Sequence, residues 1–416
     1  FHLNINKFSK NSTILLIFFI SGLISLVPMF TVGFPTSFNA FNNDLIVYLL
    51  NPEWINKHSY LWGHIPTTNE FSLDNFSTHL IKNLHERIGL DYLTLNIMNF
   101  MALQSYQVFG ILSSFFYSIF TGVTYLFLKH VLQLSKIICN IVILLVAINP
   151  VMALMTYSQF IPQLAGICLM IAFFMIFMKM LEQEDKKTWT QYIILLAILL
   201  SGAISIYPEI IVYFLIFSLV LLIKILIQKK FSVKELFQLS KILGLASLLN
   251  IPAFIIMIYK QIFILHIANN LVPVGNIQYF VSIFNYLGHM FGLFPTPQAF
   301  NRIVDNYFSL SLIIKIIIIF IILICIYGFI KSSNKYKSEV IYLSVSCVLL
   351  FLYFRFIKAF PYGAYKHVII SEFVLIIFLA LSLEYLILSV KRWHFERICV
   401  IFAISLLICG SIASVA

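Results

Sequence analysis

The first carboxylate of the chain, Asp44, follows the first apolar run and lies in the long polar segment from Val32 to Asn99. The apolar run ends near Phe30, so Asp44 is expected close to a membrane surface. A carboxylate in that position could take a proton from an acceptor hydroxyl and act as a general base. The alternative interpretation is structural, because Asn42-Asn43-Asp44 is also typical of a turn. Both interpretations stay open on the sequence alone.

Three basic residues, Arg355, Lys358 and Lys366, lie between two late apolar runs. The spacing of Arg355 and Lys358 places them on one face if a helix continues through them. The proline and glycine at Pro361 and Gly363 allow the chain to turn and bring Lys366 to the same depth. Converging cations at a membrane surface predict an anionic ligand, for which a lipid-linked phosphate is a candidate. Simple snorkelling toward ordinary headgroups is the alternative.

Glu209 follows Tyr207-Pro208, where one apolar run ends and the next begins. An ionisable group at the membrane edge is costly unless it is paired or wetted, which favours a cavity. The alternative is an exposed turn at the interface. Two further ionisable residues, Lys315 and Glu372, lie at similar depths within apolar runs, and we expect them to form a structural ion pair.

The residues between these candidates are mostly apolar, with 61% hydrophobic and only 10% charged residues in the chain. A helix needs about 20 apolar residues to cross a hydrocarbon core of about 30 Å, and open strands cannot cross it. The pattern predicts an all-α, polytopic membrane bundle of about 11 helices that forms a single transmembrane domain over residues 1–416. The expected spans are 14–30, 104–128, 137–157, 163–181, 191–206, 208–228, 238–259, 310–330, 339–354, 368–390 and 398–416.

The basic residues predict how this bundle is oriented. Lys and Arg cluster beyond the ends of alternate runs, as the positive-inside rule requires. No cleavable signal is evident, so the first run is expected to be retained, with a cytoplasmic N-terminus and with residues 31–103 and 260–309 on the outer side. The net charge of +11 is then explained by membrane orientation and contact with membrane lipids, and no nucleic-acid partner is expected.

Other motif classes are absent from the sequence. All six cysteines fall in apolar runs, which argues against a disulfide framework. There is no phosphate-binding loop, dinucleotide fingerprint or zinc-protease motif, and the outer histidines match no standard zinc spacing. We therefore expect no metal and no cofactor.

Two short stretches resemble a known family. They are Asn43-Asp44-Leu45-Ile46-Val47-Tyr48, leading into Pro52-Glu53-Trp54-Ile55, and Pro361-Tyr362-Gly363-Ala364-Tyr365-Lys366. Together with the order of helices and outer loops, they resemble bacterial cell-envelope members of the GT-C superfamily of polytopic membrane glycosyltransferases. Residues 1–416 include neither the soluble C-terminal domain common in that family nor the metal-associated acidic motif of its oligosaccharyltransferase branch.

The resemblance implies an inverting glycosyltransferase in the bacterial plasma membrane, with its active site facing outward. The expected partners are a polyprenyl-phosphate-linked sugar donor and a glycan or polymer acceptor; protein partners are unknown. The resemblance implies that Asp44 is the catalytic base, and the residues expected to bind the donor are Arg355, Lys358, Tyr365, Lys366 and Glu209. Two alternatives stay open: a flippase or transporter of a lipid-linked or anionic substrate, and a non-catalytic membrane subunit of an envelope-assembly complex.

Overall fold

The chain is an all-α membrane protein, as the sequence predicts. A computed structural model describes residues 12–32, 44–58, 88–149, 155–156, 160–183, 188–227, 233–270, 287, 312–357 and 361–389. This part is about 92% helical and contains no strands. Its α-helices and short π and 3-10 helices (η) are α1 (Ser12–Val32), α2 (Asp44–Lys57), α4 (Ile88–Met101), α5 (Ser105–Leu126), η3 (Phe127–Val131), α6 (Lys136–Ala147), α8 (Ile161–Leu181), α9 (Trp189–Ile206), η5 (Pro208–Ile210), α10 (Ile211–Ile227), α11 (Val233–Leu249), α12 (Ile251–Asn270), α15 (Leu312–Lys331), α16 (Lys337–Leu352), η6 (Tyr353–Ile357) and α17 (Pro361–Ser389).

The expected count of about 11 spans is wrong for this structure. Within the described residues, five helices are long and apolar enough to cross a membrane, or six if one bent pair is a single span. Three further apolar helices are shorter than a full span. The expected span 398–416 and most of the expected outer segments 31–103 and 260–309 lie outside the described residues. The five spans are Ser105–Val131, Ile161–Leu181, Trp189–Ile206, Lys337–Ile357 and Lys366–Ile387.

One expected span, 137–157, is interrupted. Helix α6 has 12 residues and ends at Ala147, so it rises about 18 Å, little more than half of a hydrocarbon core. The hydroxyl of Tyr117 on α5 donates to the carbonyls of Val146 and Ala147, at 3.2 and 2.8 Å. Unpaired carbonyls at a buried helix end are costly; the hydroxyl of Tyr117 pairs with the carbonyl of Ala147 and adds a second partner to that of Val146, which also accepts from the backbone N–H of Asn149. Apolar composition continues past the break, which is why hydropathy alone overestimated the helix.

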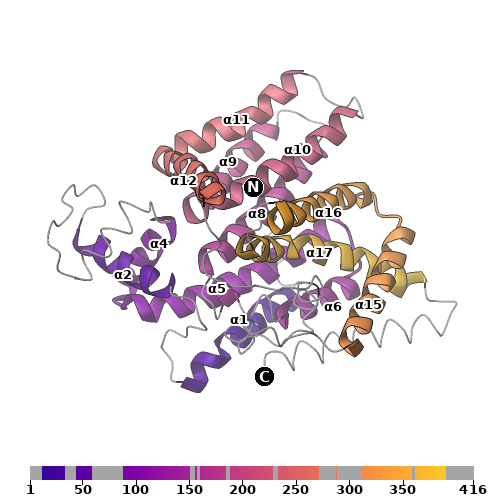
Figure 1. Cartoon of the computed structure of the whole chain (residues 1–416), viewed down its shortest axis with the longest axis horizontal. Coiled ribbons are helices and arrows are strands. Elements are labelled where there is room, and N and C mark those ends of the chain that lie inside the picture. Colours follow the sequence, from indigo (N-terminus) through magenta and orange to yellow (C-terminus); the bar gives the residue numbers. More distant parts are fainter. Residues whose placement is uncertain are drawn as a thin grey trace.

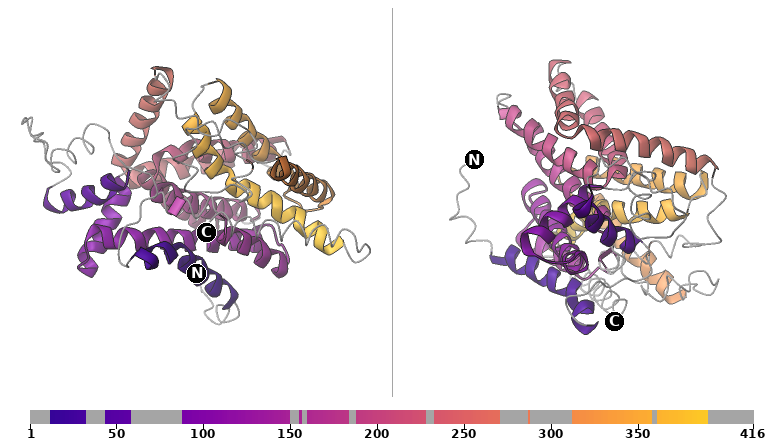
Figure 2. Two further views of the ribbon diagram at one scale, coloured as in Figure 1. Left: turned by 60° about the horizontal axis from the view of Figure 1, so that its bottom comes forward. Right: turned by 90° about the vertical axis from the view of Figure 1, so that its left-hand side faces the viewer.

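A second expected span, 238–259, is two helices that meet at 104°. Asn250 occupies the corner: its side-chain oxygen accepts a hydrogen bond from the backbone N–H of Ala253, and its amide donates to Ser205 on α9. Capping the first turn of α12 in this way starts a new helix rather than continuing α11. Figure 2 shows the sharp change of direction from α11 to α12. Helix α12 packs on η5 and α9, and α11 packs along α9.

Small polar residues allow α1 and α5 to approach closely. Ser21 and Thr121 share a hydrogen bond of 2.9 Å, and Ser114 donates to the carbonyl of Gly22. A Cβ atom at Gly22 would lie 2.7 Å from the hydroxyl of Ser118. Close packing through small residues with hydrogen bonds between helices is how membrane helices associate without a hydrophobic driving force.

Among the spanning helices, α5, α8 and α17 have the largest share of buried residues, and they form the centre of the bundle (Figure 1). Helix α5 packs on α1 and α8, α8 packs on α9, and α17 packs on α15, α16 and α6. The hairpin of α2 and α4 lies at one end of this bundle and α15 lies toward the other (Figure 1). The fold therefore has two distinct ends, and the candidate residues can be assigned to one or the other.

The end that contains Glu182 gathers basic residues. Lys179 and Lys335 form salt bridges with Glu182, at 2.8 and 2.6 Å, and the hydroxyl of Tyr336 also donates to it. Asn334, in the same turn, donates to the carbonyl of Leu132. Basic turns that are far apart in sequence, after η3, after α8 and between α15 and α16, thus meet at one end of the bundle, in agreement with the alternation of Lys and Arg on which the proposed orientation rests.

These contacts predict a pH dependence of stability. Burial would raise the pKa of Glu182, but the hydrogen bonds from Lys179, Lys335 and Tyr336 outweigh it and lower the pKa from 4.5 to about 2. The stabilisation is complete above about pH 4.5 and is lost as pH falls toward the folded-state pKa of about 2. Because Lys335 is about half exposed, we expect only about 1 kcal/mol.

Thermal unfolding of the detergent-solubilised protein, measured from about pH 6 to about pH 3, checks this expectation. The difference in stability between wild type and Glu182→Gln should shrink as the pH falls. A difference that stays constant over this range would show that the ionised carboxylate is not the stabilising group.

Candidate functional site

At the end of the bundle opposite Glu182, a buried histidine joins three helices. His367 on α17 is 1% exposed. Its Nε2 lies 2.7 Å from the carbonyl of Cys347 on α16, and its Nδ1 lies 2.7 Å from the hydroxyl of Tyr213 on α10. A carbonyl only accepts, so Nε2 carries the proton; in the neutral ring, Nδ1 then accepts from Tyr213. The ring of Tyr213 also stacks on the imidazole, with centroids 5.5 Å apart.

Lys366 is adjacent to His367 at the start of the span of α17. Its Nζ lies 5.9 Å from the ring centroid of Phe160, and its backbone carbonyl accepts a hydrogen bond of 3.2 Å from the side chain of Gln163 on α8. Gln163 is 2% exposed, so this hydrogen bond fixes the first turn of α8 against the second turn of α17. The lysine is only partly buried, which leaves its charged end at the rim of the bundle.

Arg355 lies in the π-helical turn η6 that ends α16. Its neighbour Phe354 packs against the imidazole of His367, with ring centroids 6.2 Å apart. The guanidinium carbon lies 5.7 Å from the ring centroid of Phe356. A π-helical turn widens the backbone and often occurs at functional sites. The sequence predicted an ordinary helical face here; the structure places Arg355 one residue away from a contact with His367.

Glu209 lies in the short helix η5 between α9 and α10. Tyr213, which contacts His367, is one helical turn farther along the chain. Tyr207, on the other side, is so close to α8 that a Cβ atom at Gly166 would lie 3.0 Å from its Cβ. Glu209 is partly buried and interacts with its surroundings. The structure therefore brings Glu209, Arg355 and Lys366 to the same end of the bundle, around the contacts of His367.

Asp44 is the first residue of α2, and the other two residues of the predicted turn, Asn42 and Asn43, lie outside the described residues. A carboxylate in the first turn of a helix is favoured by the helix dipole. Helix α2 contacts α5 through the ring of Tyr48, which stacks on Phe109 with centroids 5.8 Å apart, and through Glu53, which accepts a hydrogen bond of 3.2 Å from the backbone N–H of Ser105. The side-chain amide of Asn51 also donates to Asp91 of α4, at 3.2 Å. The carboxylate of Glu53 thus caps α5 and fixes the orientation of α2.

A continuous series of contacts links α2 to the rim at Lys366. From Phe109, which stacks on Tyr48, α5 continues one turn to Ser113, which donates to the carbonyl of Thr156. The neighbouring carbonyl of Met155 accepts from the backbone N–H of Phe160, whose ring lies beside Lys366. Helix α2 and the basic rim therefore belong to one end of the molecule.

The side chains of three predicted site residues lie outside the described part of the structure. Lys358 lies outside the described residues, and only the backbone of Tyr365, in α17, is described. The side chain of Asp44 is likewise outside the described part. The contacts of these three side chains with the rim remain predictions.

The expected ion pair of Lys315 with Glu372 is wrong. Glu372 on α17 is 2% exposed and accepts a hydrogen bond of 3.0 Å from the side chain of Asn149, at the end of α6. The salt bridges among the described residues all involve Glu182. Helices α15 and α17 meet near Gly328 and Ser382, several turns away from Lys315, so equal depth in the sequence did not produce a contact.

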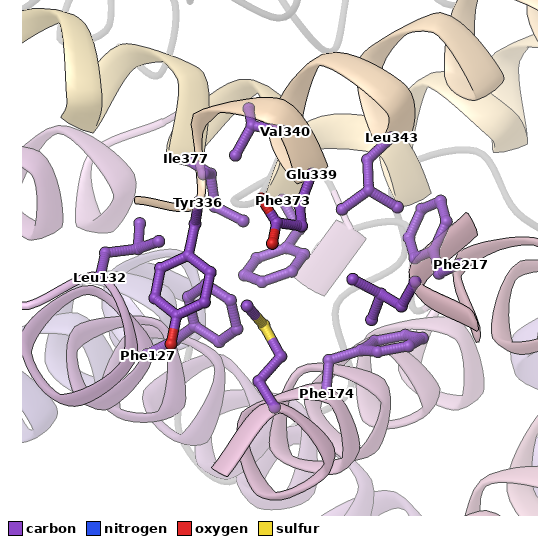
Figure 3. A pocket seen from close by; sticks show the side chains of 12 residues that line it. Phe127, Leu132, Phe174, Phe217, Tyr336, Glu339, Val340, Leu343, Phe373 and Ile377 are labelled. Carbon is purple, nitrogen blue, oxygen red and sulfur yellow. The ribbon is translucent and has the colours of Figure 1, made fainter. Parts of the chain in front are cut away.

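A small cavity lies nearer the Glu182 end. It offers about 20 Å³ to the centre of a water molecule, which is room for about one water. Its lining is mostly aromatic and aliphatic, with Tyr336 and Glu339 as the polar members (Figure 3). The cavity is too small for a sugar and is not formed by any of the predicted site residues.

Within the described residues, no group of three or more His, Cys, Asp or Glu side chains is arranged to hold a metal ion. The chain matches no protein-family model and no curated protein.

The sequence places His367 beside the basic residues, but sequence reasoning missed Tyr213 and Gln163 and the contacts through which these residues connect the rim. The available signal was their polarity, since Gln163 and Tyr213 stand within otherwise apolar runs. Buried polar side chains in membrane helices must find partners, and these three partners come from helices that are distant in sequence.

Proposed function

We propose that this protein is a membrane glycosyltransferase that moves a sugar from a polyprenyl-phosphate carrier to a cell-envelope glycan or polymer on the outer face of the bacterial plasma membrane. The observation that carries the proposal is the gathering of Arg355, Lys366 and Glu209 around His367, at the same end as the helix that begins at Asp44. A lipid-linked donor would place its phosphate at this rim, next to the surface of the membrane.

Each group has a role in the proposed reaction. Asp44 removes the proton from the acceptor hydroxyl, whose oxygen attacks the anomeric carbon with inversion. The bond from that carbon to the phosphate oxygen breaks, and Arg355 and Lys366 stabilise the phosphate that departs. In this proposal Glu209 accepts hydrogen bonds from sugar hydroxyls. The buried contacts of His367 keep the rim in place by joining α10, α16 and α17.

Binding of the carrier tests the rim directly. In the double variant Arg355→Ala with Lys366→Ala, we expect affinity for a polyprenyl monophosphate to fall by at least tenfold, because charge-assisted hydrogen bonds contribute about 1.5–3 kcal/mol each. Native mass spectrometry of the purified protein with that lipid measures the effect.

The matched control for the double variant is Lys136→Ala, which removes an exposed positive charge at the start of α6, at the opposite end. It should leave binding of the lipid unchanged. Equal loss in both proteins would mean a general attraction to anionic lipid, and no loss in the double variant would favour snorkelling.

A specific observation also favours a transporter. Helix α6 ends inside the bundle beside a buried carboxyl, and α11 and α12 are sharply bent. Interrupted helices and intramembrane ionisable groups are characteristic of transporters. A transporter would move a lipid-linked substrate across the membrane without cleaving it. In reconstituted vesicles, movement of an intact carrier lipid without release of its sugar would support this candidate over the transferase.

A further inference from the structure

We infer that Glu372 and Asn149 form a binding site for a proton or a small monovalent cation inside the membrane bundle. The inference does not depend on the proposed transferase reaction. It rests on a carboxyl group that is 2% exposed, on the interrupted helix that reaches it, and on the lack of a positively charged partner within the described part of the chain.

The carboxyl group has one oxygen satisfied and one not. Oε1 of Glu372 accepts the hydrogen bond from the amide of Asn149 at 3.0 Å, whereas Oε2 is buried with no hydrogen-bond partner in the described structure. A buried polar atom that lacks a partner is costly, so an unmatched oxygen of this kind indicates that something else occupies the position.

The surroundings supply no compensating charge. The charged groups and histidines on the helices packed against α17 are Lys136 on α6, Lys179 on α8, Lys315 and Lys331 on α15, Lys337 and Glu339 on α16, Arg355 in η6, and Lys366, His367 and Glu384 on α17 itself. Within the described residues, none of them forms a hydrogen bond or salt bridge with Glu372. An isolated carboxylate in such a place is strongly disfavoured, and binding of a cation removes the charge.

The end of α6 favours the same ligand. The C-terminal end of a helix carries a partial negative charge, and α6 ends two residues before Asn149. Tyr117 satisfies the carbonyls of Val146 and Ala147, so the helix stops without needing to continue. Asn149 itself is only partly buried, in contrast to Glu372.

The first test measures thermal stability of the purified full chain in detergent, because a ligand that binds the folded state raises the unfolding temperature. One arm varies the pH from about 8 to about 6 in choline chloride; the other varies sodium or lithium at about pH 8. For wild type we expect the unfolding temperature to increase by about 2 °C for each tenfold rise in the free concentration of the cation that binds. Glu372→Gln, which keeps the shape without an ionisable group, should not respond.

The two arms identify the cation. A response to pH alone indicates a proton, and a response to sodium or lithium at constant pH indicates a metal cation; either supports the site. Wild type and Glu372→Gln responding equally in both arms would overturn it. Asn149→Ala removes the hydrogen bond at Oε1 and should shift the midpoint of the response without abolishing it, so it tests the site even if Glu372→Gln folds poorly.

A chemical probe gives a second reading. Dicyclohexylcarbodiimide enters membranes and adds to a protonated carboxyl group: the acid O–H adds across one C=N bond, and the resulting O-acylisourea rearranges to a stable N-acylurea. Peptide mass spectrometry should find this adduct on Glu372, with less of it as the pH or the concentration of the bound metal cation rises. Modification of Glu209 in the same sample with none on Glu372 at any pH would count against the site.

Discussion

Asp44→Asn is expected to reduce sugar transfer by about 10²- to 10⁴-fold, which is the contribution of a general base. The substitution removes the charge at the first residue of α2 but keeps a side chain of the same shape that is well suited to a helix start. The contacts that hold α2, through Tyr48 and Glu53, do not involve the substituted side chain. The loss should therefore occur without loss of the folded bundle.

The measurement compares the envelope glycans of cells that contain wild type or variant at equal abundance, by mass spectrometry. Asp44→Glu is the matched control, since it keeps a carboxylate and should retain part of the activity. Retention of more than about a tenth of wild-type transfer in Asp44→Asn falls outside the range for a general base and would exclude that role. That result would not affect the proposal that Arg355 and Lys366 bind the carrier lipid, which has its own test.

Gly89→Ala is expected to destabilise the protein by about 1–3 kcal/mol and to reduce transfer as well. A Cβ atom at Gly89 would lie 2.4 Å from the backbone carbonyl oxygen of Ser205 and 2.6 Å from its carbon. Backbone atoms of α9 cannot move aside as a flexible side chain can, so α4 must shift away from the bundle. Helix α2 packs on α4, and the start of α2 at Asp44 would shift with it.

The matched control is Gly244→Ala, in α11, where a Cβ atom would meet nothing within 4 Å. There the same change removes a glycine from a helix interior and should be neutral or stabilising by about 0.5–1 kcal/mol. Thermal unfolding in detergent and the transfer assay are measured for both variants. Equal stability of the two variants would mean that α4 does not pack on α9 as the structure indicates.

The sequence by itself determined the class of this protein. Apolar runs long enough for a membrane, with few charges inside them, predict helices because each helix satisfies its own backbone hydrogen bonds. The hydropathy of a segment is a sum over its own residues, so it can be read without knowing which residues contact each other. The basic turns between helices can likewise be recognised from the sequence without knowledge of contacts. In the structure, the turns that contain Lys335 and Lys179 meet at Glu182.

Tertiary structure decided where helices stop and which polar groups meet. Helix α6 ends at Ala147 because Tyr117 satisfies its last carbonyls, and α12 starts at a corner because Asn250 caps it and binds Ser205. Glu372 pairs with Asn149 instead of Lys315 for the same reason. Hydropathy averages over such residues, whereas a buried hydrogen bond depends on the position of one atom relative to a helix distant in sequence. Contacts of this kind, including those of His367 with Tyr213 and Cys347, exist only once the helices have packed.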